Sequence, residues 1–249
     1  MSRKREELRA AAVPAADLRH AAESSRSNRR DFAAALLSKR PAIISEIKKA
    51  SPSKGVLVEH FRPAELARQY EQGGAAALSV LTDREFFQGS LDDLSAARAA
   101  CTLPVIRKDF TLTDYHVLEA AAVGADAILL IVAILDDEEL RSLRELAADF
   151  GMASLVEAHS APELERAVRS DAKIIGINNR DLNTFRVSLD TSVALAKDIP
   201  EGVIKVSESG IFSAPDIRRL MNAGYDAFLV GEHLVKSGNA TQALKELVA

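Results

Sequence analysis

The segment SEIKKASPSKG at residues 45–55 places a carboxylate, Glu46, two residues before an ammonium, Lys48, where an apolar run ends. The run itself, residues 42–44, has the β-branched character of a strand, and the proline and glycine that follow interrupt regular structure. Side chains two apart on a strand face the same side, so we expect Glu46 and Lys48 to project together. An isolated Glu-x-Lys of this kind is most often a structural ion pair. Whether it has a function depends on which side chains lie at the ends of the other strands.

Four other apolar runs end in side chains of similar chemistry. In residues 103–108, alternation places Ile106 and Lys108 on one face and Arg107 on the other, so one of the two bases points inward. Lys and Glu in a partly dry site shift each other's pKa and supply the proton donors and acceptors of general acid–base chemistry. Each of these polar side chains alone is more often solvated or paired with a neighbour. Packing, however, does not require seven polar side chains to gather at the strand ends. The expected ring consists of Glu46, Lys48, Lys108, Glu157, Asn178, Arg180 and Glu208.

Small residues follow the last two predicted strands, at Ser209, Gly210 and Gly231. Small residues expose backbone N–H groups and let an anion approach closely. In (β/α)8 barrels the loops after strands 7 and 8 commonly form a phosphate site. We therefore expect a phosphate site here, to which Ser51 would add a hydroxyl. A Ser-Gly pair alone is a weak signal, since ordinary turns contain it.

The elements that must position these residues repeat along the chain. From residue 41 a short apolar strand, a polar loop and an amphipathic helix recur, and Gly74, Gly124 and Gly224 supply left-handed helix C-caps directly before the next strand. The spacings of 50 and 100 residues between these glycines fit two and four units of about 25 residues. Eight such units would extend from residue 41 to about residue 241.

The alternation of strands and helices fits an open doubly wound sheet or a closed (β/α)8 TIM barrel. We favour the barrel because it brings the polar strand ends together in one mouth, the rim formed by the C-terminal ends of the strands. The predicted strands lie at residues 41–47, 75–81, 103–108, 126–132, 152–157, 173–178, 203–208 and 226–231. The predicted helices lie at residues 62–73, 90–100, 113–123, 136–149, 161–169, 189–198, 213–223 and 239–248.

Residues 1–40 precede the first strand and form a predicted helical extension, broken at Pro14 and at residues 24–27. Its apolar side chains can pack on the catalytic barrel at residues 41–249, so we expect one structural domain overall. A cap over the barrel mouth is the favoured role of the extension, and a partner-binding helix is the alternative.

The composition excludes several classes of protein. Apolar residues make up 47% of the 249 residues, enough for a large core, and the net charge of −4 gives no reason to expect nucleic acid or an anionic membrane as partner. The longest apolar run, residues 127–135, is too short to span a bilayer. Cys101 is the only cysteine, so an intrachain disulfide or a cysteine metal cluster cannot form. We expect a cytoplasmic protein and, since no long exposed apolar stripe stands out, a monomer.

Four segments resemble the indole-3-glycerol phosphate synthase family, and the resemblance runs over the whole chain. They are residues 46–55 (EIKKASPSKG), 104–110 (PVIRKDF), 176–182 (GINNRDL) and 206–211 (VSESGI), in the family's order. The resemblance implies a (β/α)8 barrel with a helical N-terminal extension. It also implies ring closure, decarboxylation and dehydration of 1-(2-carboxyphenylamino)-1-deoxyribulose 5-phosphate in tryptophan biosynthesis, with no metal or organic cofactor.

The resemblance also implies roles for single residues. Lys108 would be the general acid at the sugar ketone, and Glu157 would stabilise charge on the anilino nitrogen and assist proton transfer. Lys48 would meet the substrate carboxylate and join the dehydration, with Glu46 tuning it and accepting a proton; how the two lysines divide the steps stays open. The remaining catalytic or substrate-binding positions are Asn178, Arg180, Glu208, the phosphate-site residues Ser51, Ser209, Gly210, Gly231 and Glu232, and the anthranilate-pocket residues Phe110, Leu129 and Leu182.

Two positions, His159 and Glu232, do not follow directly from the resemblance. The family often has Val-His-Asp or Val-His-Thr after the catalytic Glu, whereas residues 158–160 are Ala-His-Ser, and we expect His159 to be a structural strand-end residue. Glu232 would repel a phosphate, so we expect it to point away or to interact only through its backbone N–H.

Two other functions compete with this interpretation. Phosphoribosylanthranilate isomerase resembles it in fold and phosphate site, but that chemistry is associated with a Cys and an Asp at strand ends, whereas Cys101 precedes the third strand. A non-catalytic barrel that binds a phosphosugar or a partner would be expected to lose Lys108 or Glu157 first. Both are present, which favours the enzyme.

Overall fold

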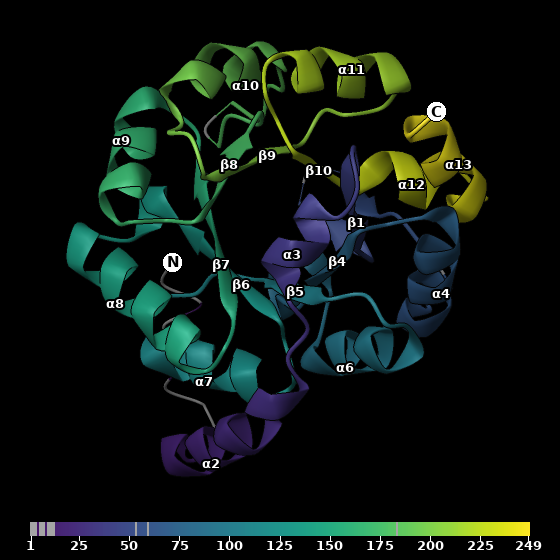
Figure 1. Ribbon diagram of the computed structural model, residues 1–249. Coiled ribbons are helices and arrows are strands. Elements are labelled where there is room, and N and C mark those ends of the chain that lie inside the picture. The colour runs from purple at the N-terminus through teal and green to yellow at the C-terminus, as the bar shows by residue number, and fades with distance from the viewer. Residues whose placement is uncertain (1–3, 5–7, 9–12, 53, 59, 183) are drawn as a thin grey trace.

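Eight parallel strands close into a barrel in the order β1-β10-β9-β8-β7-β6-β5-β4 (Figure 1). The computed structural model describes residues 4, 8, 13–52, 54–58, 60–182 and 184–249. β1 pairs with both β10 and β4, so the sheet has no free edge and the open doubly wound alternative is excluded. The predicted TIM barrel is confirmed. Its strands are β1 (Ala42–Ile47), β4 (Ala77–Leu81), β5 (Val105–Lys108), β6 (Ala127–Ile131), β7 (Ala153–Ala158), β8 (Ile174–Asn178), β9 (Ile204–Glu208) and β10 (Ala227–Val230).

Helices between the strands form the outer ring that Figure 1 shows. Gly74, Gly124 and Gly224 have φ values of 95°, 88° and 98°, so each supplies the predicted left-handed backbone before the next strand begins. The helices of the ring are α4 (Pro63–Gly73), α6 (Leu91–Ala100), α7 (Asp114–Ala122), α8 (Asp137–Asp149), α9 (Ala161–Arg169), α10 (Asp190–Leu195) continued by the 3-10 turn η3 (Ala196–Asp198), α11 (Ala214–Asn222) and α13 (Ala240–Leu247).

The sequence did not predict several short elements at the mouth. They follow β1, β4, β6 and β10, and each is too short to show a hydrophobic period. They are the hairpin of β2 (Ala50–Ser51) and β3 (Gly55–Val56), α5 (Arg84–Phe87), the 3-10 turn η2 (Val132–Ile134) and α12 (Glu232–Lys236).

The N-terminal extension contains α2 (Ala15–Ser25), the 3-10 turn η1 (Arg26–Asn28) and α3 (Phe32–Leu37). α2 packs on α7, and α3 lies across the barrel axis (Figure 1). Phe32 and Leu36 are each 1% exposed and pack with residues at the starts of the strands, such as Ala42. The expected cap over the mouth is therefore wrong for α2 and α3, because α3 closes the opposite end of the barrel.

The core has two layers, as alternation along the strands requires. One set of side chains, including Ile43 and Val156, packs between the sheet and the outer helices. The other set, including Ile44 and Leu155, fills the barrel interior. Within the described residues, no helix is long and apolar enough to cross a membrane.

Candidate active site

The mouth of the barrel surrounds a cavity of about 500 Å³. Strands β1, β5, β6, β7, β8, β9 and β10, or the loops that follow them, contribute the residues that the sequence singles out. All of them line this one cavity: Glu46, Lys48, Ser51, Lys108, Phe110, Leu129, Glu157, Asn178, Arg180, Leu182, Glu208, Ser209, Gly210, Gly231 and Glu232.

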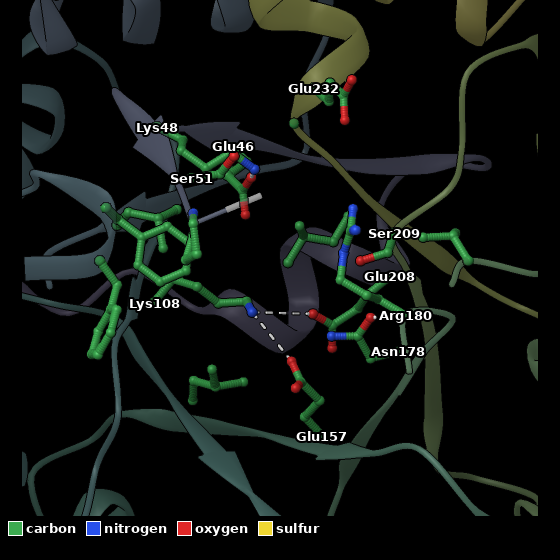
Figure 2. Close-up of a pocket in the computed structure, with 18 of the residues that line it drawn as sticks. Glu46, Lys48, Ser51, Lys108, Glu157, Asn178, Arg180, Glu208, Ser209 and Glu232 are labelled. Carbon is green, nitrogen blue, oxygen red and sulfur yellow. Dashed lines mark hydrogen bonds and ion pairs between the residues drawn. The ribbon is translucent and has the colours of Figure 1, made fainter. Parts of the chain in front are cut away.

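Lys108, at the end of β5, points into the cavity between two carboxylates (Figure 2). Its Nζ lies 3.2 Å from Oε2 of Glu157 and 3.5 Å from Oε2 of Glu208. Arg107 points the other way, where it donates to Thr82 and pairs with Asp109 behind the sheet. Alternation along β5 thus directs Lys108 inward and Arg107 outward.

Burial and charge act in opposite directions on this triad. Burial disfavours the charged form of Lys108, but Glu157, Glu208 and Glu46 outweigh it and raise its pKa. Burial likewise opposes the charge of Glu157, yet Lys108, His159 and a hydrogen bond from Asn178 hold the pKa of that carboxyl below its usual range. Glu157 and Lys108 are therefore an ionised pair, with the lysine holding the transferable proton.

Glu208 differs from Glu157. Its side chain is buried, and burial together with the charge of Glu157 raises its pKa against the opposing effect of Lys108. Among the described residues, neither carboxyl oxygen of Glu208 has a hydrogen-bond partner. A buried carboxyl whose hydrogen bonds are not made is costly unless a ligand completes them, even when an ammonium group such as that of Lys108 lies nearby.

Glu46 and Lys48 form an ion pair beside the cavity, as their spacing on β1 predicts. Tyr70 of α4 donates from its hydroxyl to the backbone carbonyl of Glu46 at 3.2 Å. Gly231 leaves the room that the carboxylate needs, since a Cβ there would lie 2.2 Å from Oε1 of Glu46. The strand end is thus fixed from two sides, which positions the pair.

A tight turn after β9 presents Ser209 and Gly210 to the cavity, with φ values of 68° and 77°. Asn179 holds the turn by donating from Nδ2 to the carbonyls of Glu208 at 3.0 Å and Ser209 at 3.1 Å. Asn178 faces the cavity while its neighbour Asn179 supports the turn from outside the barrel. Turns of this kind form concavities that bind anions.

Over residues 1–247 the chain matches the family described as indole-3-glycerol phosphate synthase. It is 51% identical to the enzyme of that name from Albidiferax ferrireducens, covering 99% of this chain and 95% of the relative. It is 49% identical to the one from Aromatoleum aromaticum, covering 99% and 96%. The chain belongs to the indole-3-glycerol phosphate synthase family. Its activity is that of a carboxy-lyase of tryptophan biosynthesis, which confirms the function that the four motif segments predict.

Solved structures resemble this member of the indole-3-glycerol phosphate synthase family in fold alone. The tryptophan synthase alpha-subunit from Pyrococcus furiosus aligns with a TM-score of 0.63 at 13% identity, covering 83% of this chain and 97% of that one. The N-acetylmannosamine-6-phosphate 2-epimerase from Clostridium perfringens aligns with a TM-score of 0.65 at 16% identity, covering 84% and 93%.

Glu232 lines the cavity of this family member, and two lysines neutralise its negative charge. Lys54, from the hairpin loop after β1, and Lys236, one helical turn further along α12, both pair with the Glu232 carboxylate. Although burial opposes the ionised form, these two ammonium groups lower the pKa of Glu232 to about 2. The carboxylate thus remains ionised beside the predicted phosphate site, and two cations offset its repulsion.

Several residues of the site were not predicted. Lys4 lines the cavity and lies 2.7 Å from Oδ1 of Asp109, but a lone lysine in the extension gives no signal in the sequence. Phe86 packs edge-to-face on Phe110 with ring centroids 6.2 Å apart; the adjacent phenylalanines in the loop after β4 were the available signal. No signal in the sequence indicated that His159 contacts Glu157 directly.

Among the described residues, no group of three or more His, Cys, Asp or Glu side chains is arranged to hold a metal ion. The Lys, Glu and His side chains of the site can transfer protons and stabilise charge.

Proposed function

We propose that the cavity binds 1-(2-carboxyphenylamino)-1-deoxyribulose 5-phosphate and closes its indole ring with Lys108 as the general acid. The observation that carries this proposal is the position of Lys108, a charged donor held between Glu157 and Glu208 inside the cavity. Lys108 donates its proton to the ketone oxygen as the anthranilate ring carbon attacks the ketone carbon. Carbon dioxide then leaves, and its bonding electrons restore the aromatic ring.

Glu157 stabilises the positive charge that develops on the anilino nitrogen during the attack. It is suited to this because it stays ionised and lies within 3.2 Å of Lys108. Glu208 and Asn178 orient the substrate hydroxyls, which would complete the hydrogen bonding that the Glu208 carboxyl lacks among the described residues.

Dehydration involves the second lysine. Lys48 meets the substrate carboxylate before it leaves and then serves the departure of the hydroxyl group as water, while its partner Glu46 accepts a proton. One ion pair lies on β1 and the other between β5 and β7. This separation supports two different sites of proton transfer within the cavity. The Lys108→Ala variant tests how Lys48 and Lys108 divide these steps.

The two ends of the substrate occupy different walls. The phosphate lies against Ser51, Ser209, Gly210 and Gly231, with Arg180 and Glu232 at its edge, and the anthranilate ring lies among Phe110, Leu129 and Leu182. The apolar wall excludes water from the attacking carbon, which strengthens the electrostatic interactions there. We further propose a cytoplasmic monomer that uses no cofactor; the single buried Cys101 supports a reducing compartment.

The test is the appearance of indole fluorescence when this substrate is added to the intact protein and to Lys108→Ala. The protein contains no Trp, so the background at the product's emission is low. We expect signal from the intact protein and a loss of about 10²–10⁴-fold in kcat in the variant, the usual contribution of a general acid. Signal that survives in Lys108→Ala moves the acid to Lys48. If the intact protein binds the substrate but forms no product, the alternative of a non-catalytic phosphosugar-binding barrel is the better explanation.

A further inference from the structure

His159 lies directly after β7, between two carboxylates. Its Nε2 is 3.3 Å from Oε1 of Glu157, and its Nδ1 is 3.1 Å from Oε2 of Glu163 in α9. The backbone N–H of His159 also donates to Oε2 of Glu163 at 2.8 Å, which fixes the start of the helix against the strand. The contact with Glu157 is an ion pair without a well-directed hydrogen bond.

Glu157 has different partners at its two oxygens. Lys108 lies at Oε2 and His159 at Oε1, so the carboxylate connects the two cations. The Lys108 and Glu163 side chains at the two ends of this series are 14% and 22% exposed, whereas Glu157 and His159 between them are 3% and 10% exposed. Four ionisable groups therefore form a continuous path whose middle is buried.

The path joins two cavities. Glu157 and Lys108 line the cavity of the active site, while His159 and Glu163 line a neighbouring cavity of about 650 Å³. The second cavity lies between α9 and the loop after β8, and it is lined by polar residues such as Arg186 and Thr191. His159 is the ionisable contact through which the second cavity reaches Glu157, beside Asn178, which lines both cavities and also hydrogen-bonds to Glu157.

The proposed reaction creates a need for such a path. The substrate enters as a carboxylate, and its ketone oxygen takes up two protons before it leaves as water. One proton returns from the C1 methylene group as the ring becomes aromatic, and carbon dioxide carries none away. Each turnover therefore consumes one proton from the solvent, and one acid of the site is left neutral while the substrate-derived molecule fills the mouth.

We propose that His159 delivers this proton to the active site from the second cavity. Its Nε2–H passes to Oε1 of Glu157 and, as the carboxyl group rotates, from Glu157 to the neutral amine of Lys108. The neutral ring of His159 then turns so that its vacant Nε2, which is buried against Glu157, reaches the second cavity, takes up a proton from water there and turns back, and Glu163 again accepts from Nδ1–H. His159 acts through Glu157, so it is a positioning and relay residue for the proposed reaction, on which this inference rests.

The charges around His159 suit a proton carrier. Burial opposes its charge, but Glu157 and Glu163 outweigh burial and raise its pKa to about 9. The charge of His159 in turn acts on Glu208, the third carboxyl that faces it across the site. The imidazole is thus loaded with its proton at neutral pH, and it releases the proton once Lys108 has lost its own.

The experiment compares kcat of the intact protein and His159→Ala in weakly buffered solution, with imidazole added in increasing concentration. We expect a fall of about tenfold or more in kcat at a KM within about twofold, and a saturable recovery with imidazole, because a small acid can enter the second cavity. The intact protein should show no response. His20→Ala, which removes an exposed imidazole on α2, is the control and should behave as the intact protein.

Two outcomes overturn the relay. A kcat of His159→Ala within about twofold of the intact protein means that Lys108 is reprotonated through the mouth. A lowered kcat that no imidazole restores, at unchanged KM, means that His159 only holds Glu157 in place. If the alanine variant does not fold, His159→Asn keeps a donor to Glu157 but cannot relay a proton, and an unchanged kcat there also overturns the relay. Absence of product from the intact protein would instead contradict the proposed function.

Discussion

The two ends of the barrel interior are built from the same strands, yet one is apolar and the other is charged. On β5 the inward residue Ile106 is followed two positions later by Lys108, and on β7 Leu155 is followed by Glu157. At the N-terminal end, α3 closes the interior with Phe32, a buried aromatic ring. At the C-terminal end, the interior opens into the cavity of the active site.

The difference shows that stability and chemistry are separated along the barrel axis. Burying Phe32 contributes hydrophobic free energy at an end with no substrate access. Burying Lys108, Glu157 and Glu208 costs desolvation that their mutual pairing only partly repays. Changes at the apolar end should therefore alter stability, and changes at the charged end should alter activity.

Glu157→Gln tests the charged end and should have the largest effect. The amide keeps the shape of the side chain but removes the charge that stabilises the developing cation and supports Lys108. We expect kcat to fall about 10²–10⁴-fold, measured by indole fluorescence. Urea unfolding should show the fold retained, because the core is untouched. A large loss of stability with normal kcat would contradict the separation of the two ends.

Phe32→Ala tests the apolar end. Removing a fully buried aromatic ring leaves a void between α3 and the barrel floor, which should lower the free energy of unfolding by about 3–5 kcal/mol. Urea denaturation measures this loss. At a temperature where the variant stays folded, its kcat should lie within about twofold of the intact protein, since the residue is at the far end of the barrel. A kcat as low as that of Glu157→Gln would show that the two ends are coupled.

The pH dependence of stability provides the finest comparison. The folded-state pKa of His159, about 9, is above its ordinary value of 6.5, so its stabilising effect is complete below pH 6.5 and is lost as pH rises towards 9. His159→Asn should flatten this decline, by on the order of 1–2 kcal/mol after screening by solvent. Phe32→Ala should keep the slope of the intact protein. Denaturation midpoints between pH 6 and 9.5 distinguish the two, and equal slopes in His159→Asn and the intact protein would remove His159 as the source.

Much of the barrel could be predicted because its signals are local. The glycine C-caps at Gly74, Gly124 and Gly224 need a left-handed backbone that the residue type itself favours, and each marks the start of a strand. The inward direction of Lys108 follows from alternation once Ile106 is placed inside. The site residues could be gathered from the sequence because parallel strands of a closed barrel end at one mouth. Their individual roles, and the division at residue 40, stay predictions.

Other features depend on contacts between distant segments. The position of α3 could not be predicted, because a helix of six residues, all of them apolar, packs equally well on any apolar surface of suitable size. Lys4 reaches the site from the N-terminal extension and pairs there with Asp83 and Asp109, which are both buried. No local pattern specifies either contact.

The sequence by itself determined the eight βα units, the ring of charged residues at the strand ends and the family. The tertiary structure alone decided which charges pair: Lys108 with both Glu157 and Glu208, Lys54 with Glu232, and His159 with the outer oxygen of Glu157. The physical reason is the distance over which each interaction acts. Alternation and capping act over a few residues, whereas the pKa of a buried group depends on every charge within several ångströms, and closure of the barrel decides which charges those are.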